Sequence, residues 1–251
     1  MSRVSGMLRS ALRGVFHGRL IVRRLPAAVG GARVHLSPES QLKYLLPGRR
    51  GFDRDLLAWA ERYVSTGDVV WDIGANSGVF TFAAAGRGAS VLAVEPDPFL
   101  VHGLLRSRAA NPGLQTEVLS AAASDARGEA RLAIAVGGRA SNSLRAFGSD
   151  RRYVGRSGLE VIVPTLRLDD LLALSAPNLV KIDVEGAELA VFRGAARLLA
   201  ETRPRIIFEV GRELWPEISS LLRRAHYRLV DPLDPLRPAD ETTWNVMALP
   251  E

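Results

Sequence analysis

The sequence predicts an α/β fold: a doubly wound, mostly parallel seven-stranded sheet with helices on both faces. From residue 52 onward, short apolar runs alternate with segments of helical periodicity. The strand-like runs are continuously apolar, which is typical of parallel strands that helices cover on both faces. Several of these runs also end in an acid. Buried acids are costly unless they are paired, so the pattern indicates a functional site at the carboxyl ends of the strands.

The elements can be assigned in chain order from this periodicity. We expect strands at 68–73, 90–95, 114–123, 179–184, 204–210, 227–231 and 242–249, with the last two as a closing pair. We expect helices at 53–64, 77–86, 98–110, 187–200 and 213–226. Residues 51–251 are therefore assigned to one domain, and residues 1–50 to a basic N-terminal extension with a helix and short strands.

Charge is concentrated at the N-terminus. Residues 1–38 hold seven arginines and no acid, whereas the rest of the chain holds 26 basic and 27 acidic residues. The near-neutral main body does not favour a nucleic-acid partner. The absence of cysteine excludes disulfides, thiolate metal sites and a cysteine nucleophile.

Residues 1–25 have three open interpretations. Apolar residues recur there at helical spacing opposite arginines, so the segment is either a solvated, frayed helix or a helix lying on an anionic membrane. Its arginine-rich, acid-free composition is also typical of an organelle targeting peptide. No apolar run approaches the ~20 residues that span a bilayer. We therefore expect a cytoplasmic protein, with peripheral membrane contact as the alternative.

The stretch from Asp72 to Gly78, DIGANSG, is a strand-to-helix turn that suits a nucleotide-type ligand. A dinucleotide prefers G-x-G-x-x-G, but Asn76 and Val79 occupy the second and third glycine positions. S-adenosyl-L-methionine carries an ammonium and a carboxylate, and Asp72 with the backbone amides of the turn could bind both. Glu95, at the end of the next strand, could accept the ribose hydroxyls of either ligand.

Five stretches resemble the FkbM-type S-adenosylmethionine-dependent methyltransferases, which have a class I, Rossmann-like fold. They are DIGANSGVF (72–80), VEPDP (94–98), AAASDARGEA (121–130), VPTLRLDDLL (163–172) and LVKIDVEGAELAVFRGAARLL (179–199). The resemblance covers roughly residues 50–250. It implies a methyltransferase whose acceptor is a hydroxyl oxygen of a sugar, glycolipid or natural product.

The resemblance also assigns residues to parts of the cofactor. The methionine end would lie against Asp72, Gly74, Ala75, Asn76, Ser77 and Gly78. The ribose would lie at Glu95 and Pro96, and the adenine near Ser124 and Asp125. Asp183 would be the cofactor contact nearest the transferred methyl group.

The chemistry is expected at Lys181, Asp183 and Glu185. An alcohol acceptor must lose a proton, and a nearby carboxylate can take it. On an extended segment, Asp183 and Glu185 would point the same way, with Glu185 as base or orienting group. Lys181 either pairs with an acid or polarises the acceptor. We expect no dedicated metal site, although Asp183, Glu185 and Glu209 could together hold Mg²⁺ or Ca²⁺.

An insert at 137–158 is placed to cover the acceptor. It carries Arg139, Arg145, Arg151, Arg152 and Arg156 against one acid. Long connections are usually functional or disordered. Because guanidinium groups bind phosphates and carboxylates, the insert suggests an acidic acceptor, either a small molecule or a glycan.

Three other functions stay open at this stage. N-methylation needs little more than positioning of an amine. An NAD-type oxidoreductase conflicts with the glycine pattern, and a non-catalytic binding protein conflicts with the intact acids. The sequence does not predict the oligomeric state.

Overall fold

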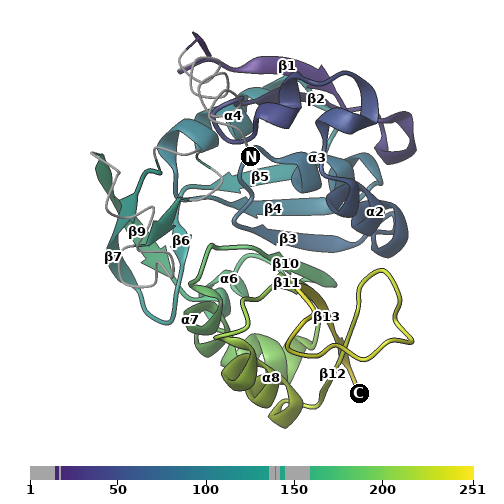
Figure 1. Cartoon of the computed structure of the whole chain (residues 1–251), viewed down its shortest axis with the longest axis vertical. Helices are drawn as coiled ribbons and strands as arrows, with labels where there is room; N and C mark the ends of the chain where they lie inside the picture. The colour runs from purple at the N-terminus through teal and green to yellow at the C-terminus, as the bar shows by residue number, and fades with distance from the viewer. Residues whose placement is uncertain (1–14, 17, 136–138, 140–141, 145–158) are drawn as a thin grey trace, which may run out of the picture.

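A mixed seven-stranded sheet forms the centre of the computed structural model, which describes residues 15–16, 18–135, 139, 142–144 and 159–251 (Figure 1). Its strands, in spatial order, are β12 (Tyr227–Val230), β13 (Asn245–Pro250), β11 (Arg205–Glu209), β10 (Leu179–Ile182), β3 (Val69–Ile73), β4 (Ser90–Val94) and β5 (Thr116–Leu119). Only β13 among these seven runs against its neighbours, because it returns beside β12 as the closing pair that the sequence predicted.

Helices cover both faces of this sheet. One face is covered by α2 (Arg54–Tyr63), α3 (Val79–Gly86) and α4 (Pro98–Ala109). The other is covered by α6 (Leu168–Leu171), α7 (Glu188–Arg193), the π-helical turn η5 (Leu198–Thr202) and α8 (Trp215–Arg224). Neighbouring strand residues alternate between the two cores, since Val70 packs into the first and Trp71 into the second. Both faces are therefore apolar, as the continuous strand patterns indicated.

Two predicted elements differ in the structure. The strand expected at 114–123 is two strands, β5 and β6 (Ala122–Ala123), because β6 leaves the main sheet to pair with β9. The helix expected at 187–200 ends at Arg193, and a separate π-helical turn follows.

A second sheet lies beyond the carboxyl ends of strands of the main one and was not predicted. Its order is β6, β9 (Glu160–Leu166), β7 (Gly128–Ala133) and β8 (Ser143–Leu144). Strands β7 and β9 form an antiparallel pair on either side of the insert. They project to one side of the main sheet in Figure 1.

The described N-terminal residues pack against the domain. Strands β1 (Ile21–Arg24) and β2 (Arg33–Leu36) pair, and the one-turn helices η1 (Ala27–Val29), η2 (Leu42–Leu45) and η3 (Gly48–Gly51) follow around them. Buried side chains of this segment, such as Val34 and Tyr44, belong to the same core as α3. At Gly30 the backbones are so close that a Cβ would lie 2.4 Å from the carbonyl oxygen of Gly86.

The strand order reverses between β3 and β10. The loops that follow these two strands diverge, which in open α/β sheets leaves a crevice for ligands at the carboxyl ends. No helix in the described part of the chain is long and apolar enough to cross a membrane.

Candidate active site

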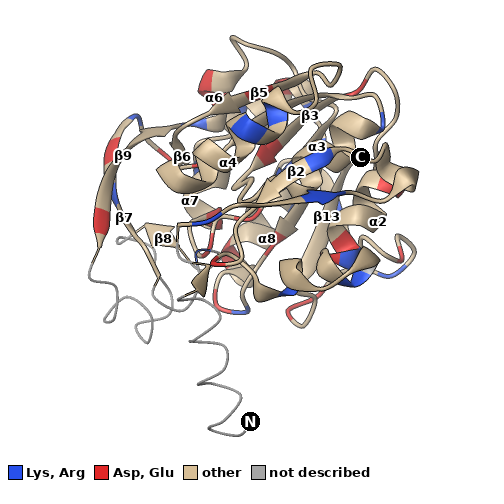
Figure 2. Cartoon of the chain, turned by 90° about the horizontal axis from the view of Figure 1, so that it is seen from above, with Lys and Arg blue, Asp and Glu red and all other residues tan. Residues whose placement is uncertain are grey.

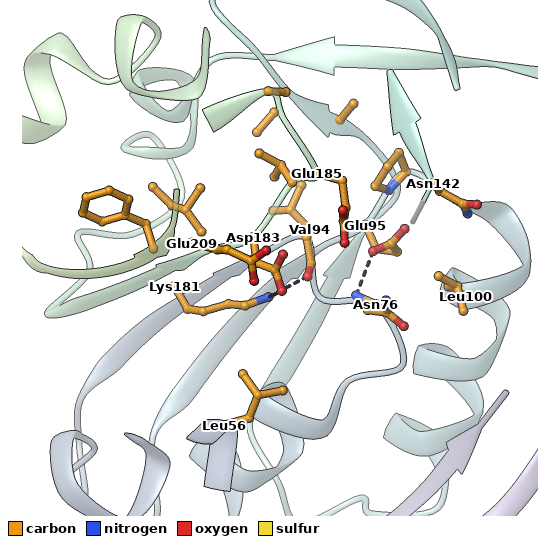
Figure 3. Close-up of a pocket in the computed structure, with 18 of the residues that line it drawn as sticks. Leu56, Asn76, Val94, Glu95, Leu100, Asn142, Lys181, Asp183, Glu185 and Glu209 are labelled. Atoms are coloured by element: carbon orange, nitrogen blue, oxygen red, sulfur yellow. Dashed lines mark hydrogen bonds and ion pairs between the residues drawn. The ribbon is translucent and has the colours of Figure 1, made fainter. Parts of the chain in front are cut away.

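A cavity of about 310 Å³ lies at this reversal point, at the ends of β3, β4, β10 and β11. Ligand pockets usually have volumes of roughly 300–1,000 Å³. An apolar group of lining residues comes from β4 to β8: Val94, Pro96, Leu100, Ala121, Ala122, Ala123, Leu132 and Leu144. An acidic group comes from α2 and from the ends of β10 and β11: Asp53, Asp55, Asp183, Glu185 and Glu209. Figure 3 shows Leu100 and Glu209 on opposite sides of Glu95.

The turn after β3 needs its glycines for packing. Gly74 has φ +73°, and a Cβ there would lie 1.9 Å from the carbonyl oxygen of Asp183. Gly78 has φ +80°, and a Cβ there would lie 2.5 Å from Leu104. Because a side chain cannot be accommodated at either position, the turn stays close to β10 and presents Gly74 and Asn76 to the cavity.

Glu95 is held by backbone amides at the end of β4. Its two carboxylate oxygens accept from the N–H groups of Asn76 at 2.8 Å and Asp97 at 2.9 Å. The side chain is only 5% exposed. Burial outweighs these hydrogen bonds and raises the pKa of Glu95 to about 7.

Asp72 already has an ammonium partner within the chain. Its carboxylate is fully buried, accepts from the Thr81 hydroxyl at 2.6 Å through Oδ2, and lies 3.1 Å from Lys181 Nζ through Oδ1. The second contact is an ion pair without hydrogen-bond alignment. Direct contact between Asp72 and a cofactor ammonium stays a prediction, whereas in this structure the ammonium beside Asp72 is that of Lys181.

Lys181 is buried in β10 and reaches toward the turn after β3. Its Nζ donates to the Gly74 carbonyl at 2.7 Å and lies 3.6 Å from Asp183 Oδ2. Burial by itself lowers the pKa of the ammonium, but the carboxylates of Asp72 and Asp183 outweigh it and raise the pKa. Lys181 is therefore a buried cation among carboxylates. This agrees with the prediction that it pairs with an acid.

The extended geometry expected for Asp183 and Glu185 is wrong. Strand β10 ends at Ile182, and Glu185 adopts φ +54°, so the chain turns there. Non-glycine residues in this region are strained, which is common at functional sites. Asp183 and Glu185 nevertheless line the same cavity, beside Glu209 (Figure 3).

Glu185 and Glu209 are electrostatically crowded. Water reaches the Glu185 side chain, but protein surrounds it in the concave wall of the cavity. Partial desolvation by this wall, together with the carboxylates of Asp183 and Glu209, raises the pKa of this exposed glutamate to about 8. Burial and the carboxylate of Asp183 raise the pKa of Glu209 to about 7. The acidic group thus contains two carboxyl groups whose pKa values lie near neutral pH.

The cavity contains part of the predicted set. Gly74, Asn76, Glu95, Pro96, Lys181, Asp183 and Glu185 line it. Asp72, Ala75, Ser77, Gly78, Ser124 and Asp125 do not. Ser77 shares a hydrogen bond with buried Tyr44, and Asp125 is exposed beyond β6, with its Oδ1 3.3 Å from the Ser124 hydroxyl. The short side chains of 121–123 form the wall where Ser124 and Asp125 were expected.

Sequence reasoning missed several lining residues. Asp55 and Trp59 come from α2, and Trp244 and Asn245 come from the start of β13. The signal was available in part, because α2 and β13 were both predicted, but their position over the cavity depends on tertiary packing.

One residue of the insert is anchored at the cavity. Arg139 donates to Asp97 at 2.7 Å and to Glu39 at 2.9 Å, and its guanidinium lies over the Phe99 ring at 4.5 Å. Asn142 also donates to Asp97, at 2.7 Å. The other four arginines that suggested an acidic acceptor (Arg145, Arg151, Arg152 and Arg156) lie outside the described residues.

The metal alternative gains no support from the geometry. Within the described ranges, no three histidine or acidic side chains are grouped so that they could hold a metal ion. Asp183, Glu185 and Glu209 therefore form an acidic wall without a common metal position.

The methyltransferase FkbM domain model matches residues 72–229, which is more than half of the chain. The chain belongs to the FkbM methyltransferase family. The matched range begins at Asp72 and includes Glu95, Lys181, Asp183 and Glu185, so it contains the core of the cavity. A search of the curated proteins finds no significant match.

One solved structure supports the fold of this FkbM domain. An FkbM methyltransferase from Methylobacillus flagellatus KT matches with a TM-score of 0.51 at 18% identity, over 73% of this chain and 44% of that one. This chain thus spans less than half of that protein's length. A precorrin-6y C5,15-methyltransferase from Geobacter metallireducens GS-15 (TM-score 0.48, 12% identity, 78% and 86% of the two chains) and a tRNA (uracil-54, C5)-methyltransferase from Pyrococcus abyssi (0.47, 15%, 92% and 43%) are more weakly similar. The latter two likenesses support no inference about this chain.

Proposed function

We propose that this FkbM domain transfers a methyl group from S-adenosyl-L-methionine to a hydroxyl oxygen of a sugar, glycolipid or other natural product. The observation that carries the proposal is the two-part cavity at the strand reversal. Its apolar group suits a nucleoside, and its acidic group supplies bases where an acceptor would meet it.

The cofactor fits the apolar group and Glu95. Alanines 121–123 with Leu132 and Leu144 offer an apolar wall that suits an adenine ring. Glu95 is fixed by two amides, yet a carboxylate has about four acceptor positions, so it can still accept ribose hydroxyls. When bound, the cofactor supplies an electrophilic methyl group on a sulfonium.

Glu185 is the best candidate for general base. It lies in the cavity beside Asp183, and its pKa of about 8 is close to working pH, where proton transfer from an acceptor hydroxyl is most effective. Asp183 forms an ion pair with Lys181, which would restrain its carboxylate. The carboxylate can then orient the acceptor or the methyl end of the cofactor. These roles need positioning within about 3–3.5 Å of the reacting atoms.

The charges of the described residues that line the cavity favour a neutral or cationic acceptor. Carboxylates of Asp55, Glu185 and Glu209 line the cavity. Asp53 is paired with Lys43, and the cations among the described lining residues, Lys181 and Arg139, are also ion-paired. An acidic acceptor would meet like charge there, which is unfavourable. We therefore propose a neutral or cationic acceptor in place of the acidic one that the insert suggested.

The acidic wall also supports a second candidate, N-methylation of a small amine. A protonated amine would be attracted to the wall and could lose its proton to Glu185. The product's site of methylation distinguishes the two candidates.

Two measurements test the proposed function. Calorimetry should show that the protein binds S-adenosylhomocysteine and gives no heat with NAD⁺; the reverse result would overturn the cofactor assignment. Incubation with methyl-labelled S-adenosylmethionine and a panel of a neutral glycoside, an amino alcohol and a sugar phosphate should label one of the first two. Labelling of the sugar phosphate alone would contradict the proposed acceptor class.

A further inference from the structure

Lys181 joins three parts of the site through one buried ammonium. Its Nζ lies 2.7 Å from the carbonyl oxygen of Gly74, 3.1 Å from Asp72 Oδ1 and 3.6 Å from Asp183 Oδ2. These oxygens belong to the turn after β3, to β3 itself and to the segment after β10. The residue is 3% exposed, and Figure 3 shows its side chain extended toward Asp183.

This geometry leaves Lys181 little capacity for an acceptor. A lysine ammonium has three N–H donors. The Lys181 ammonium donates one hydrogen bond, to Gly74, and forms ion pairs with Asp72 and Asp183. Moving it toward an acceptor would lengthen these contacts, so the geometry disfavours the direct catalytic role that the sequence left open.

Asp72 is the counter-ion that the buried ammonium requires. It is fully buried, Thr81 binds its Oδ2, and its Oδ1 has no aligned hydrogen bond and faces Lys181. A buried charge without a partner is strongly unfavourable. Neither Thr81 nor Asp72 lines the cavity, whereas Lys181 does. Their side chains therefore act on the site through Lys181.

We propose that Lys181 is a positioning residue: it fixes the Gly74 turn and the Asp183 carboxylate relative to each other, with Asp72 as its counter-ion. The inference rests on the proposed function, because it assigns the Gly74 turn to the cofactor and Asp183 to the methyl end. The site is thereby preorganised by a contact between β3 and β10, the two strands at the reversal point.

The test separates positioning from packing. Lys181→Met should lower the melting temperature and weaken S-adenosylhomocysteine binding about tenfold or more, as expected when a hydrogen bond to a charged group is lost. The double variant Asp72→Asn/Lys181→Met removes both charges, so its melting temperature should recover toward the wild-type value. Its affinity should stay about tenfold low, because the turn and Asp183 are still unfixed.

Thr81→Val is the matched control, because it disturbs Asp72 from the other side without touching Lys181. It should lower the melting temperature and leave the affinity within about twofold. Wild-type affinity in the double variant, or a tenfold loss in Thr81→Val, would overturn the inference. If the double variant does not fold, Lys181→Arg decides: affinity within about threefold of wild type supports positioning by the charge, and a tenfold loss contradicts it.

The same titration reports separately on the proposed function. If the wild-type protein does not bind S-adenosylhomocysteine, the proposed function fails. If the wild type binds it and the variants give one of the overturning results named above, only the role of Lys181 fails.

Discussion

The ends of β3 and β4 carry two buried carboxylates in different surroundings. Asp72 on β3 has a lysine and a hydroxyl as partners, whereas Glu95 after β4 accepts hydrogen bonds from two backbone amides. Burial and the nearby carboxylate of Asp183 likewise raise the pKa values of Glu185 and Glu209, after β10 and β11. The comparison teaches that the fully buried, ion-paired acid serves the structure. The cavity acids whose pKa values are raised, Glu95, Glu185 and Glu209, are the ones that a ligand can compensate.

The largest effect should follow from Glu185. Replacing it with glutamine removes the proposed base and should lower turnover about 100- to 10,000-fold, the usual contribution of acid–base catalysis. S-adenosylhomocysteine affinity should change little, because the proposed cofactor contacts lie elsewhere. Methyl-transfer rates and calorimetry on the same preparation measure both. Unchanged turnover would remove Glu185 from the mechanism.

Next is the stability cost of removing the paired acid. Asp72→Ala leaves the Lys181 ammonium without its closest carboxylate and should destabilise the fold by about 3–5 kcal/mol. Urea unfolding of both proteins measures the difference. A loss below about 1 kcal/mol would show that Asp72 is not a structural counter-ion and would break the comparison.

Glu95 should act on stability in the opposite direction to an ion-paired acid. Its pKa is raised from 4.5 to about 7 in the folded state, so the folded protein holds its proton more tightly than the unfolded chain. Stability should therefore fall as pH rises from about 4.5 to 7, by up to about 3 kcal/mol from this group. The wild-type-minus-Glu95→Gln difference in unfolding free energy across this range isolates the effect from Glu185 and Glu209. A flat difference would contradict it.

The smallest effect concerns the cofactor. Glu95→Gln keeps the size of the side chain but weakens its acceptor strength toward the ribose, and S-adenosylhomocysteine affinity should fall about tenfold, near 1.4 kcal/mol. Calorimetry at pH 8, above the pKa of about 7 for Glu95, gives the clearest comparison because the wild-type group is then ionised. Equal affinities would place the ribose elsewhere.

Local patterns in the sequence were sufficient for most of the sheet and helices. Apolar runs and helical spacing depend on near neighbours, so β3, β4, β10 and α2 appear within two residues of their predicted ends. The sheet of β6 to β9 was missed because its pairings join residues far apart in the chain, and β6 is only two residues long.

The site was predictable in position and less so in orientation. Glu95, Asp183 and Glu185 were placed by strand-end logic, and all three line the cavity. The pairing of Asp72 with Lys181 was not foreseen as the main contact, because the register of β3 against β10 sets it. The left-handed backbone conformation of Glu185 could not be predicted from the sequence either, since glutamate rarely adopts it.

Arg139 has a consequence for protein engineering. It connects the segment between β7 and β9 to the N-terminal region through Glu39 and to the start of α4 through Asp97. Grafting that segment from another family member would therefore replace Arg139 and leave its two partners, Glu39 and Asp97, unchanged. A chimera that omits the arginine leaves the carboxylates of residues 39 and 97 without their shared cation, so donor segments should be chosen together with residues 39 and 97 as a single exchangeable block.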